Sequence, residues 1–324
     1  MGLKRLLPGA LALLLLLLAG GLRFQGFLSP RVGLDLLSDQ AVLGVATLGA
    51  ACVLVSGGLD LSIGSLAALS SVVLARLVAE GAWPPAAAIG ATLALGASFG
   101  AAQGAAIARF ALPPFLVTLA GMFLCRGVAL SLAEESIGIG ARALFPLSSA
   151  GVPLPGGLAL RPVGLILLAA FVALAVASRR SRFFARLHAI GGDERAARLL
   201  GVPVGRTKVQ VYALSGAFAA LAGIALALAS SAGSSIACSG LELDAIAAAV
   251  VGGIALGPGS GAYTGRGRGE VAGAFLGVLV FGVLADLVLF EGTLSAGWTR
   301  VAMAAMLLVF LGADRWLRRR SVAA

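Results

Sequence analysis

The sequence predicts an all-α integral membrane protein, and three observations support this fold class. Of its 324 residues, 60% are hydrophobic and only 12% are charged, whereas soluble domains carry about 25% charged residues. Apolar runs recur along the chain with about the 20 residues that a helix needs to cross a bilayer. Lys and Arg cluster between these runs, as the positive-inside rule requires of a multi-pass membrane protein.

The apolar runs predict about ten transmembrane helices within one transmembrane domain that covers residues 1–324. Their boundaries are least sharp beside Gly57 and Gly257, so eight helices with two re-entrant segments also fit the pattern. The predicted spans lie near residues 6–22, 39–56, 61–79, 85–107, 113–132, 163–178, 208–229, 242–257, 270–289 and 297–313.

The distribution of basic residues predicts the orientation of the chain. With the N-terminus inside, 17 of the 24 Lys and Arg fall in cytoplasmic loops and five fall in outside loops. Eight of the 17 lie in residues 179–208, which we call the 179–208 loop. This asymmetry places both termini in the cytoplasm. It also accounts for the net charge of +10 without a nucleic-acid partner.

Residue types that catalysis or metal binding requires are scarce in the chain. There is one histidine, and the three cysteines show no paired spacing. No phosphate-binding loop of the G-x-x-x-x-G-K-[ST] type occurs. The sequence therefore predicts a transport protein and not an enzyme, with no metal and no cofactor bound to this chain.

The centre of the 179–208 loop carries the signals of a short helix. Gly191 and Gly192 break the preceding structure, and Asp193 is a preferred N-cap residue. Residues 194–200 predict about two helical turns, which Gly201 ends. Because so short a helix is marginal in water alone, it needs a surface to pack against. A protein partner fits its mixture of charged and apolar side chains, and the alternative is a basic loop lying on anionic lipid.

Acidic residues in or beside the predicted spans mark candidate sites, because a charge costs roughly 2.5–3.5 kcal/mol at the centre of a membrane helix. Asp60 lies in the segment SGGLDLSIG at 56–64. It either caps the helix that follows or lines a permeation path. Glu242 and Asp244 open the eighth predicted span, and the same two roles are open for them.

Two arginines inside predicted spans, Arg76 and Arg126, need partners, and Asp286 is a candidate for either. Polar side chains of this kind, together with nearby hydroxyl groups, would suit a carbohydrate path. The candidates for that path are Asp60, Ser62, Ser65, Thr118, Arg126, Glu242 and Asp244.

Five motifs follow one another along most of the chain. They are SGGLDLSIG at 56–64, PFLVTL at 114–119, MFLCRG at 122–127, AIGGDERAAR at 189–198 and ELDAIA at 242–247. Together they resemble permease subunits of bacterial ATP-binding-cassette (ABC) importers of the ribose and simple-sugar type. Two more segments, EESI at 134–137 and EGTLSAGWT at 291–299, resemble more narrowly a permease of the galactofuranose importer.

This resemblance implies a permease that moves a monosaccharide across the cytoplasmic membrane of a bacterium. It implies a second permease subunit, identical or similar, and an extracytoplasmic sugar-binding protein. The length of the outside loop 133–162 leaves two roles open for it, a plain connector or a docking surface for an external partner. The resemblance also implies a cytoplasmic ATPase subunit that carries the ATP and Mg²⁺. The residues implied to contact the ATPase are Gly191, Gly192, Asp193, Glu194, Arg195, Arg198, Leu199 and Gly201.

Other functions are compatible with the residues themselves. They are an ion-coupled secondary transporter, or an ABC permease for branched-chain amino acids or another small solute. Three features depart from the family's pattern. Gln103 and Asp193 stand where the family usually has Asn, and an insertion at 260–269 lengthens an inside loop that the family keeps short.

Overall fold

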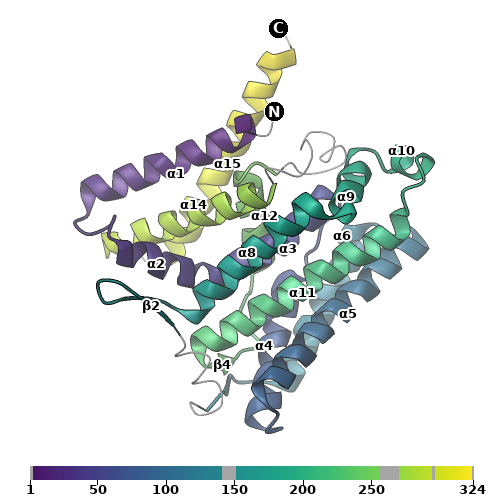
Figure 1. Ribbon diagram of the computed structural model, residues 1–324, viewed down its shortest axis with the longest axis horizontal. Helices are drawn as coiled ribbons and strands as arrows, with labels where there is room; N and C mark the ends of the chain where they lie inside the picture. Colours follow the sequence, from purple (N-terminus) through teal and green to yellow (C-terminus); the bar gives the residue numbers. More distant parts are fainter. Residues whose placement is uncertain (1–2, 141–150, 255–269, 294–295, 323–324) are drawn as a thin grey trace.

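The computed structural model describes residues 3–140, 151–254, 270–293 and 296–322 (Figure 1). These ranges are mainly helical, which confirms the predicted fold class. The helices are α1 Leu3–Arg23, α2 Pro30–Asp39, α3 Ala41–Val55, α4 Ile63–Ala79, α5 Pro85–Phe110, α6 Pro114–Leu132, α8 Pro162–Arg180, α9 Arg182–Gly192, α10 Glu194–Leu199, α11 Val204–Ser230, α12 Leu241–Val251, α14 Glu270–Glu291 and α15 Ala296–Val322.

Two short antiparallel β-pairs interrupt the helices, and the sequence did not predict them. β1 (Ile137–Gly138) pairs with β4 (Ala232–Gly233), and β2 (Val152–Leu154) pairs with β3 (Leu158–Leu160). Three of these strands lie in the predicted outside loop 133–162. The insertion at 260–269 lies outside the described residues.

Six described helices are long and apolar enough to cross a membrane, namely α1, α5, α6, α8, α11 and α14. A seventh span results if α2 and α3, which meet at an angle of 57°, are counted as one. α4 and the Gly297–Phe310 part of α15 are apolar but shorter. α12 ends at Val251, before the predicted 257, since two glycines follow and Gly253 has a φ of +96°. The total of about ten spans, the cytoplasmic termini and the single domain stay predictions.

The most buried helices are α3 and α4, in which nearly every side chain is enclosed. α5, α6, α8 and α11 surround them, and the outer helices expose many apolar side chains. Exposed apolar surface of this extent is what lipid contact requires of a bundle. Small residues recur in the segment GATLALGASFGAAQGAA at 90–106, a pattern that predicts close helix packing. The structure shows such a contact there: a Cβ added to Gly104 of α5 would come within 2.8 Å of the Cα of Val209 on α11.

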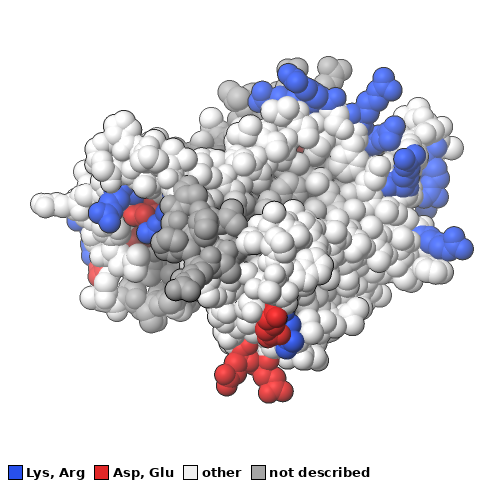
Figure 2. Space-filling model, turned by 60° about the horizontal axis from the view of Figure 1, so that its bottom comes forward, with Lys and Arg blue, Asp and Glu red and all other residues white. Residues whose placement is uncertain are grey.

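The two ends of the bundle differ in structure and charge. Figure 1 places the N-terminal end of α1, the C-terminal end of α15 and the pair α9 and α10 toward one end, and the strands toward the other. Figure 2 shows a large group of Lys and Arg side chains over one end of the molecule. The exposed basic residues of the α9–α10 end are Arg109, Arg179, Arg180, Arg182, Arg195, Arg198 and Arg206.

Candidate functional site

A break between α3 and α4, residues 56–62, carries the first group of polar side chains. Gly57 has a φ of +79°, so glycine permits the turn that ends α3. The Leu59 carbonyl accepts hydrogen bonds from the hydroxyl of Tyr212 on α11 at 3.2 Å and from Thr118 Oγ1 on α6 at 3.4 Å. Non-helical backbone inside a membrane bundle must have its polar groups satisfied, and these two helices contribute to that.

Asp60 lies in this break with both carboxylate oxygens occupied. It is 4% exposed. Its Oδ1 accepts from the backbone N–H of Ser62 at 2.9 Å and from Ser62 Oγ at 2.7 Å, and its Oδ2 accepts from Ser215 Oγ at 2.7 Å. α4 begins at Ile63, and its N-cap residue Ser62 makes no side-chain capping bond. The Asp60 carboxylate therefore does two things: it accepts the Ser62 N–H at the entrance to α4, as a capping residue would, and it joins the break to α11.

Gln103 of α5 completes this polar group. Its Oε1 lies 3.1 Å from Ser62 Oγ, while its Nε2 is buried and has no partner among the described residues. Because Ser62 has one hydroxyl hydrogen, which the shorter bond to Asp60 uses, the amide fits better when rotated so that its NH₂ donates to Ser62. Gly121 of α6 leaves the room that the Gln103 side chain fills. Ser65 lies next to this group and donates to the Ser62 carbonyl at 2.9 Å.

A second polar group lies where α12 begins. Arg126 of α6 donates through Nη1 to the carbonyls of Ser235 and Ala237, the latter at 2.9 Å. The carboxylate of Glu242, in the first turn of α12, lies against Gly64 of α4, and its Oε2 is buried without a partner among the described residues. The first turns of α4 and α12 thus meet inside the bundle.

The proposed pairing of Asp286 with an arginine is wrong. Arg126 binds backbone carbonyls, and Arg76 forms an ion pair with Glu80 at 3.0 Å and donates to the carbonyl of Leu132. Asp244 lies two residues further along α12, within electrostatic reach of Glu242 and of Arg300 on α15, and its place in the path stays a prediction. Of the seven path candidates, the structure therefore brings together Asp60, Ser62, Ser65, Thr118, Arg126 and Glu242 around the first turn of α4.

Gly64→Ala tests whether the contact between α4 and α12 matters. The added methyl group would collide with the Glu242 carboxylate and lie 2.6 Å from the Cys238 carbonyl. We expect a loss of roughly 1–3 kcal/mol of stability from overpacking, measured as a lower thermal midpoint of the solubilised protein. Gly127→Ala is the matched control, because nothing lies within 4 Å of its added methyl group. Equal midpoints for the two variants would contradict the tight contact.

The short helix predicted in the 179–208 loop is present as α10. Asp193 Oδ1 accepts from the N–H groups of Arg195 at 2.8 Å and Ala196 at 3.0 Å. The helix ends in a Schellman motif, in which Gly201, with a φ of +79°, donates to the Arg198 carbonyl at 3.1 Å. The N-cap and the C-terminal glycine are therefore confirmed. The break was placed two residues early, because Gly191 and Gly192 form the last turn of α9.

α10 presents an apolar tip on the basic end of the molecule. Leu199 and Leu200 are 89% and 82% exposed. Glu194 fixes the helix from behind, since it accepts from Arg198 at 3.1 Å and from Lys208 of α11 at 2.8 Å. The end of α9 also reaches the polar break: a Cβ added to Gly57 would lie 3.7 Å from the Cα of Gly191. α9 thus lies between the exposed tip of α10 and the break that contains Asp60.

Sequence reasoning missed the parts of the site that come from distant helices. Gln103 was noted only because it stands where the family usually has Asn, and Ser215 and Tyr212 were not considered. Their spacing of three residues on one helix face was the available signal. Among the described residues no group of three or more His, Cys, Asp and Glu side chains could hold a metal ion. The absence of a bound metal or cofactor stays a prediction.

Comparison with known proteins places this architecture. Residues 33–311 match the family described as branched-chain amino acid transport system / permease component. The chain is 39% identical over 295 residues to the inner membrane ABC transporter permease protein YjfF of Escherichia coli (strain K12), covering 91% of this chain and 87% of YjfF. It is 34% identical to the ribose import permease protein RbsC of Bacillus subtilis (strain 168), over 87% of this chain and 84% of RbsC. It is 31% identical to the fructose import permease protein FrcC of Rhizobium meliloti, over 96% of this chain and 86% of FrcC.

These findings confirm the resemblance drawn from the five motifs. All three relatives are permease proteins, two of them named for sugar import, and the matches extend well beyond the motifs. The chain therefore belongs to this family of ABC transporter permeases, and it is a multi-pass protein of the bacterial inner membrane and not an enzyme.

Proposed function

We propose that this chain is the membrane-spanning subunit of an ABC importer that moves a monosaccharide inward, energised by a separate ATPase subunit. The observation that carries the proposal is the contact between α9 and the α3–α4 break, through Gly191 and Gly57. It connects the exposed tip of α10 to the buried polar group around Asp60. A force applied at the basic end would therefore reach polar side chains inside the bundle directly.

The contact residues for the ATPase follow from this arrangement. The apolar tip at Leu199, flanked by the exposed Arg195 and Arg198, suits a protein cleft. Anionic lipid, the other candidate partner, would also attract the arginines and accept the leucines, so copurification with an ATPase subunit decides between the two partners. We assign Gly192, Asp193, Glu194, Arg195, Arg198, Leu199 and Gly201 to the contact, whereas Gly191 is buried and faces the α3–α4 break. ATP and Mg²⁺ would be held by the ATPase subunit.

A monosaccharide is the substrate class that the relatives favour. Proteins named for the import of ribose, fructose and xylose are 31–34% identical to this chain over most of its length. The family description names branched-chain amino acids, which makes that substrate the second candidate. Galactofuranose is the narrower proposal, on the resemblance of the segments at 134–137 and 291–299. In the second of these, Glu291 forms an ion pair with Arg23 at 2.7 Å.

Copurification tests the importer class. Mild solubilisation of the tagged chain from its native membrane should bring down an ATP-binding subunit and a second permease chain, identical or similar. An extracytoplasmic binding protein should then stimulate ATP hydrolysis by the complex. Uptake by the lone chain in proteoliposomes, driven by an ion gradient without ATP, would overturn the proposal in favour of a secondary transporter.

Binding measurements on the partner binding protein test the substrate. A panel of ribose, xylose, fructose, galactose and leucine, measured by calorimetry, should give binding to one sugar and none to leucine. Galactose in solution contains some furanose form, so partial occupancy with galactose alone would favour the narrower proposal. Tight binding of leucine would favour the amino-acid alternative.

A further inference from the structure

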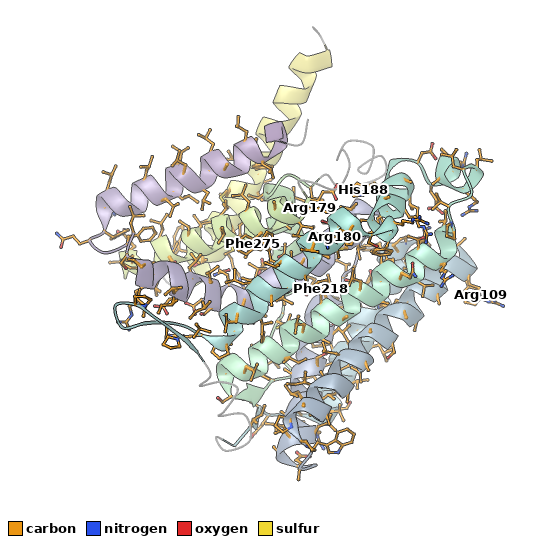
Figure 3. The ribbon with its side chains drawn as sticks, in the orientation of Figure 1. Arg109, Arg179, Arg180, His188, Phe218 and Phe275 are labelled. Atoms are coloured by element: carbon orange, nitrogen blue, oxygen red, sulfur yellow. The ribbon has the colours of Figure 1, made fainter. Side chains whose placement is uncertain are left out.

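His188, the chain's only histidine, makes a charged contact that the proposed function does not use. It lies on α9, at the end of the molecule where Figure 3 also places Arg109, Arg179 and Arg180. Its Nε2 lies 2.6 and 2.7 Å from the two carboxylate oxygens of Glu270, in the first turn of α14. Its Nδ1 lies 2.6 Å from the Phe184 carbonyl oxygen.

Both ring nitrogens of His188 face acceptors, which determines its protonation state. A neutral imidazole has one N–H and would leave one nitrogen lone pair against an oxygen, whereas the imidazolium donates from both nitrogens. Burial opposes the charge, but the hydrogen bond to Glu270, the negative charge of Glu270 and the Phe184 carbonyl outweigh it. The pKa of His188 is therefore raised above its ordinary value.

The pair is enclosed by apolar side chains. The side chains of His188 and Glu270 are 12% and 9% exposed. The pocket beside Glu270 is lined by Ala51, Cys52 and Val55 of α3, Leu174 of α8, Phe184 and Leu187 of α9 and Val271 of α14. Among the described residues, the titratable groups that face the pair are its own two members and Cys52, which is within electrostatic reach of Glu270. An ion pair in such surroundings is costly to separate, because each charge would remain buried alone.

The pair joins two parts of the bundle. α9 continues into α10, the proposed contact with the ATPase subunit. α14 packs closely on α12, since a Cβ added to Gly277 would collide with the Ala248 carbonyl. α12 carries Glu242 at its other end. α14 is also held to α8 by stacked rings of Phe275 and Phe171, whose centroids are 4.4 Å apart.

We propose that His188 and Glu270 are positioning residues that transmit displacement of α9 to α14 and α12. α9 would then act on both sides of the polar site, through Gly191 on the α3–α4 break and through His188 on α12. This inference rests on the proposed function, because it requires an ATPase subunit bound at α10. The ion pair between His188 and Glu270 does not depend on that function, and it is tested separately.

Nuclear magnetic resonance tests the ion pair without any partner protein. In the full chain labelled with ¹⁵N-histidine, purified without a histidine tag and held in lipid nanodiscs, all ring signals come from His188. We expect two protonated nitrogens of similar chemical shift at neutral pH, and a titration above the ordinary histidine range. Glu270→Gln, which keeps an acceptor but removes the charge, should return the titration toward that range. A neutral ring at neutral pH in the wild type would overturn the ion pair.

The pH dependence of the protein's stability gives a second test of the ion pair. A group whose pKa is raised by folding stabilises the protein fully below its unfolded pKa, about 6.5 for histidine, and loses this contribution as pH rises through the folded pKa. The thermal midpoint of wild type minus that of Glu270→Gln, which cancels other titrations, should therefore shrink through this window. A constant difference would contradict the pair's charge.

Transport stoichiometry tests the transmission. In proteoliposomes with the copurifying ATPase and binding protein, and with radiolabelled ribose, xylose, fructose or galactose as the probe, Glu270→Gln should lower the sugar moved per ATP by about fivefold or more. The double variant His188→Gln/Glu270→Gln, which leaves no buried charge, should remain folded and equally uncoupled. Glu80→Gln is the matched control, since it neutralises the exposed Arg76–Glu80 pair.

The outcomes separate the two proposals. Suppose that the wild type shows the imidazolium signal but both Glu270 variants move as much sugar per ATP as the wild type. This result would overturn the proposed transmission and leave the proposed importer function unaffected. ATP hydrolysis that moves none of ribose, xylose, fructose and galactose in the wild type, or a complex with no ATPase, would overturn the proposed function and with it the transmission. The ring signals would still report the ion pair in that case.

Discussion

Asp60→Ala is expected to abolish ATP-driven uptake and to lower the stability of the solubilised protein. Removing the carboxylate leaves two donors without an acceptor, the Ser62 N–H and the Ser215 hydroxyl, while the Ser62 hydroxyl keeps Gln103 Oε1 at 3.1 Å. Each buried unsatisfied group costs about 1–3 kcal/mol, and Asp60 is only 4% exposed. The break between α3 and α4 would lose its connection to α11. Uptake in proteoliposomes and the thermal midpoint are the two measurements.

Two milder variants separate the acceptor role of Asp60 from its charge. Asp60→Asn keeps one acceptor oxygen for Ser62 and offers an NH₂ that Ser215 Oγ accepts, so it should retain most of the stability. Ser215→Ala removes one donor only and should cost about 1 kcal/mol. If Asp60→Ala were as stable and as active as Ser215→Ala, the hydrogen-bonded group would not hold the break.

The features predicted correctly from sequence are those determined by neighbouring residues. The N-cap at Asp193 and the terminating glycine at Gly201 act within ten residues of one another, so a local pattern contains all the chemistry. The small-residue segment at 90–106 was also recognised, because close helix contact in lipid requires small residues whatever the partner helix is. Its partner, α11, could not be named.

The candidate site was predicted only in part, because its partners come from distant helices. Asp60 was recognised as a costly residue, yet whether it capped α4 depended on where α4 began. Ser215 on α11, 155 residues further along the chain, donates directly to Asp60. Gln103 on α5, 43 residues away, is joined to Asp60 through Ser62. The same reason explains the error on Asp286: charge complementarity suggests partners, but only packing determines which groups meet.

The helix α9 shows a different limit. Its dense charges led to the prediction of a loop that fixes topology, but Phe184, Leu187 and Ile190 recur at helical spacing and are buried. Because the helix is buried on one side, His188 is brought to Glu270, the first residue of α14. A polar composition therefore concealed an amphipathic helix.

Glu194→Lys is expected to uncouple ATP hydrolysis from transport while the protein still folds and inserts. Glu194 binds Arg198 at 3.1 Å and Lys208 at 2.8 Å, so a lysine there would bring three cations together and release α10 from α11. Because partly exposed ion pairs contribute about 1 kcal/mol or less, the thermal midpoint should change little. A large loss of transport per ATP would then reflect the position of α10 and not unfolding.

Gly201→Pro should give the same uncoupling by a different route. Gly201 has a φ of +79° and donates its N–H to the Arg198 carbonyl, whereas proline fixes φ near −65° and has no N–H. Glu80→Lys is the control for charge reversal, because Glu80 forms a comparable ion pair with Arg76 away from α10. The readout is sugar moved per ATP in proteoliposomes with the ATPase bound. If both α10 variants kept the wild-type ratio of sugar moved per ATP, the ATPase subunit would bind elsewhere on this chain. If only Glu80→Lys lowered the ratio, α10 would be dispensable and the sensitive contact would lie at Arg76.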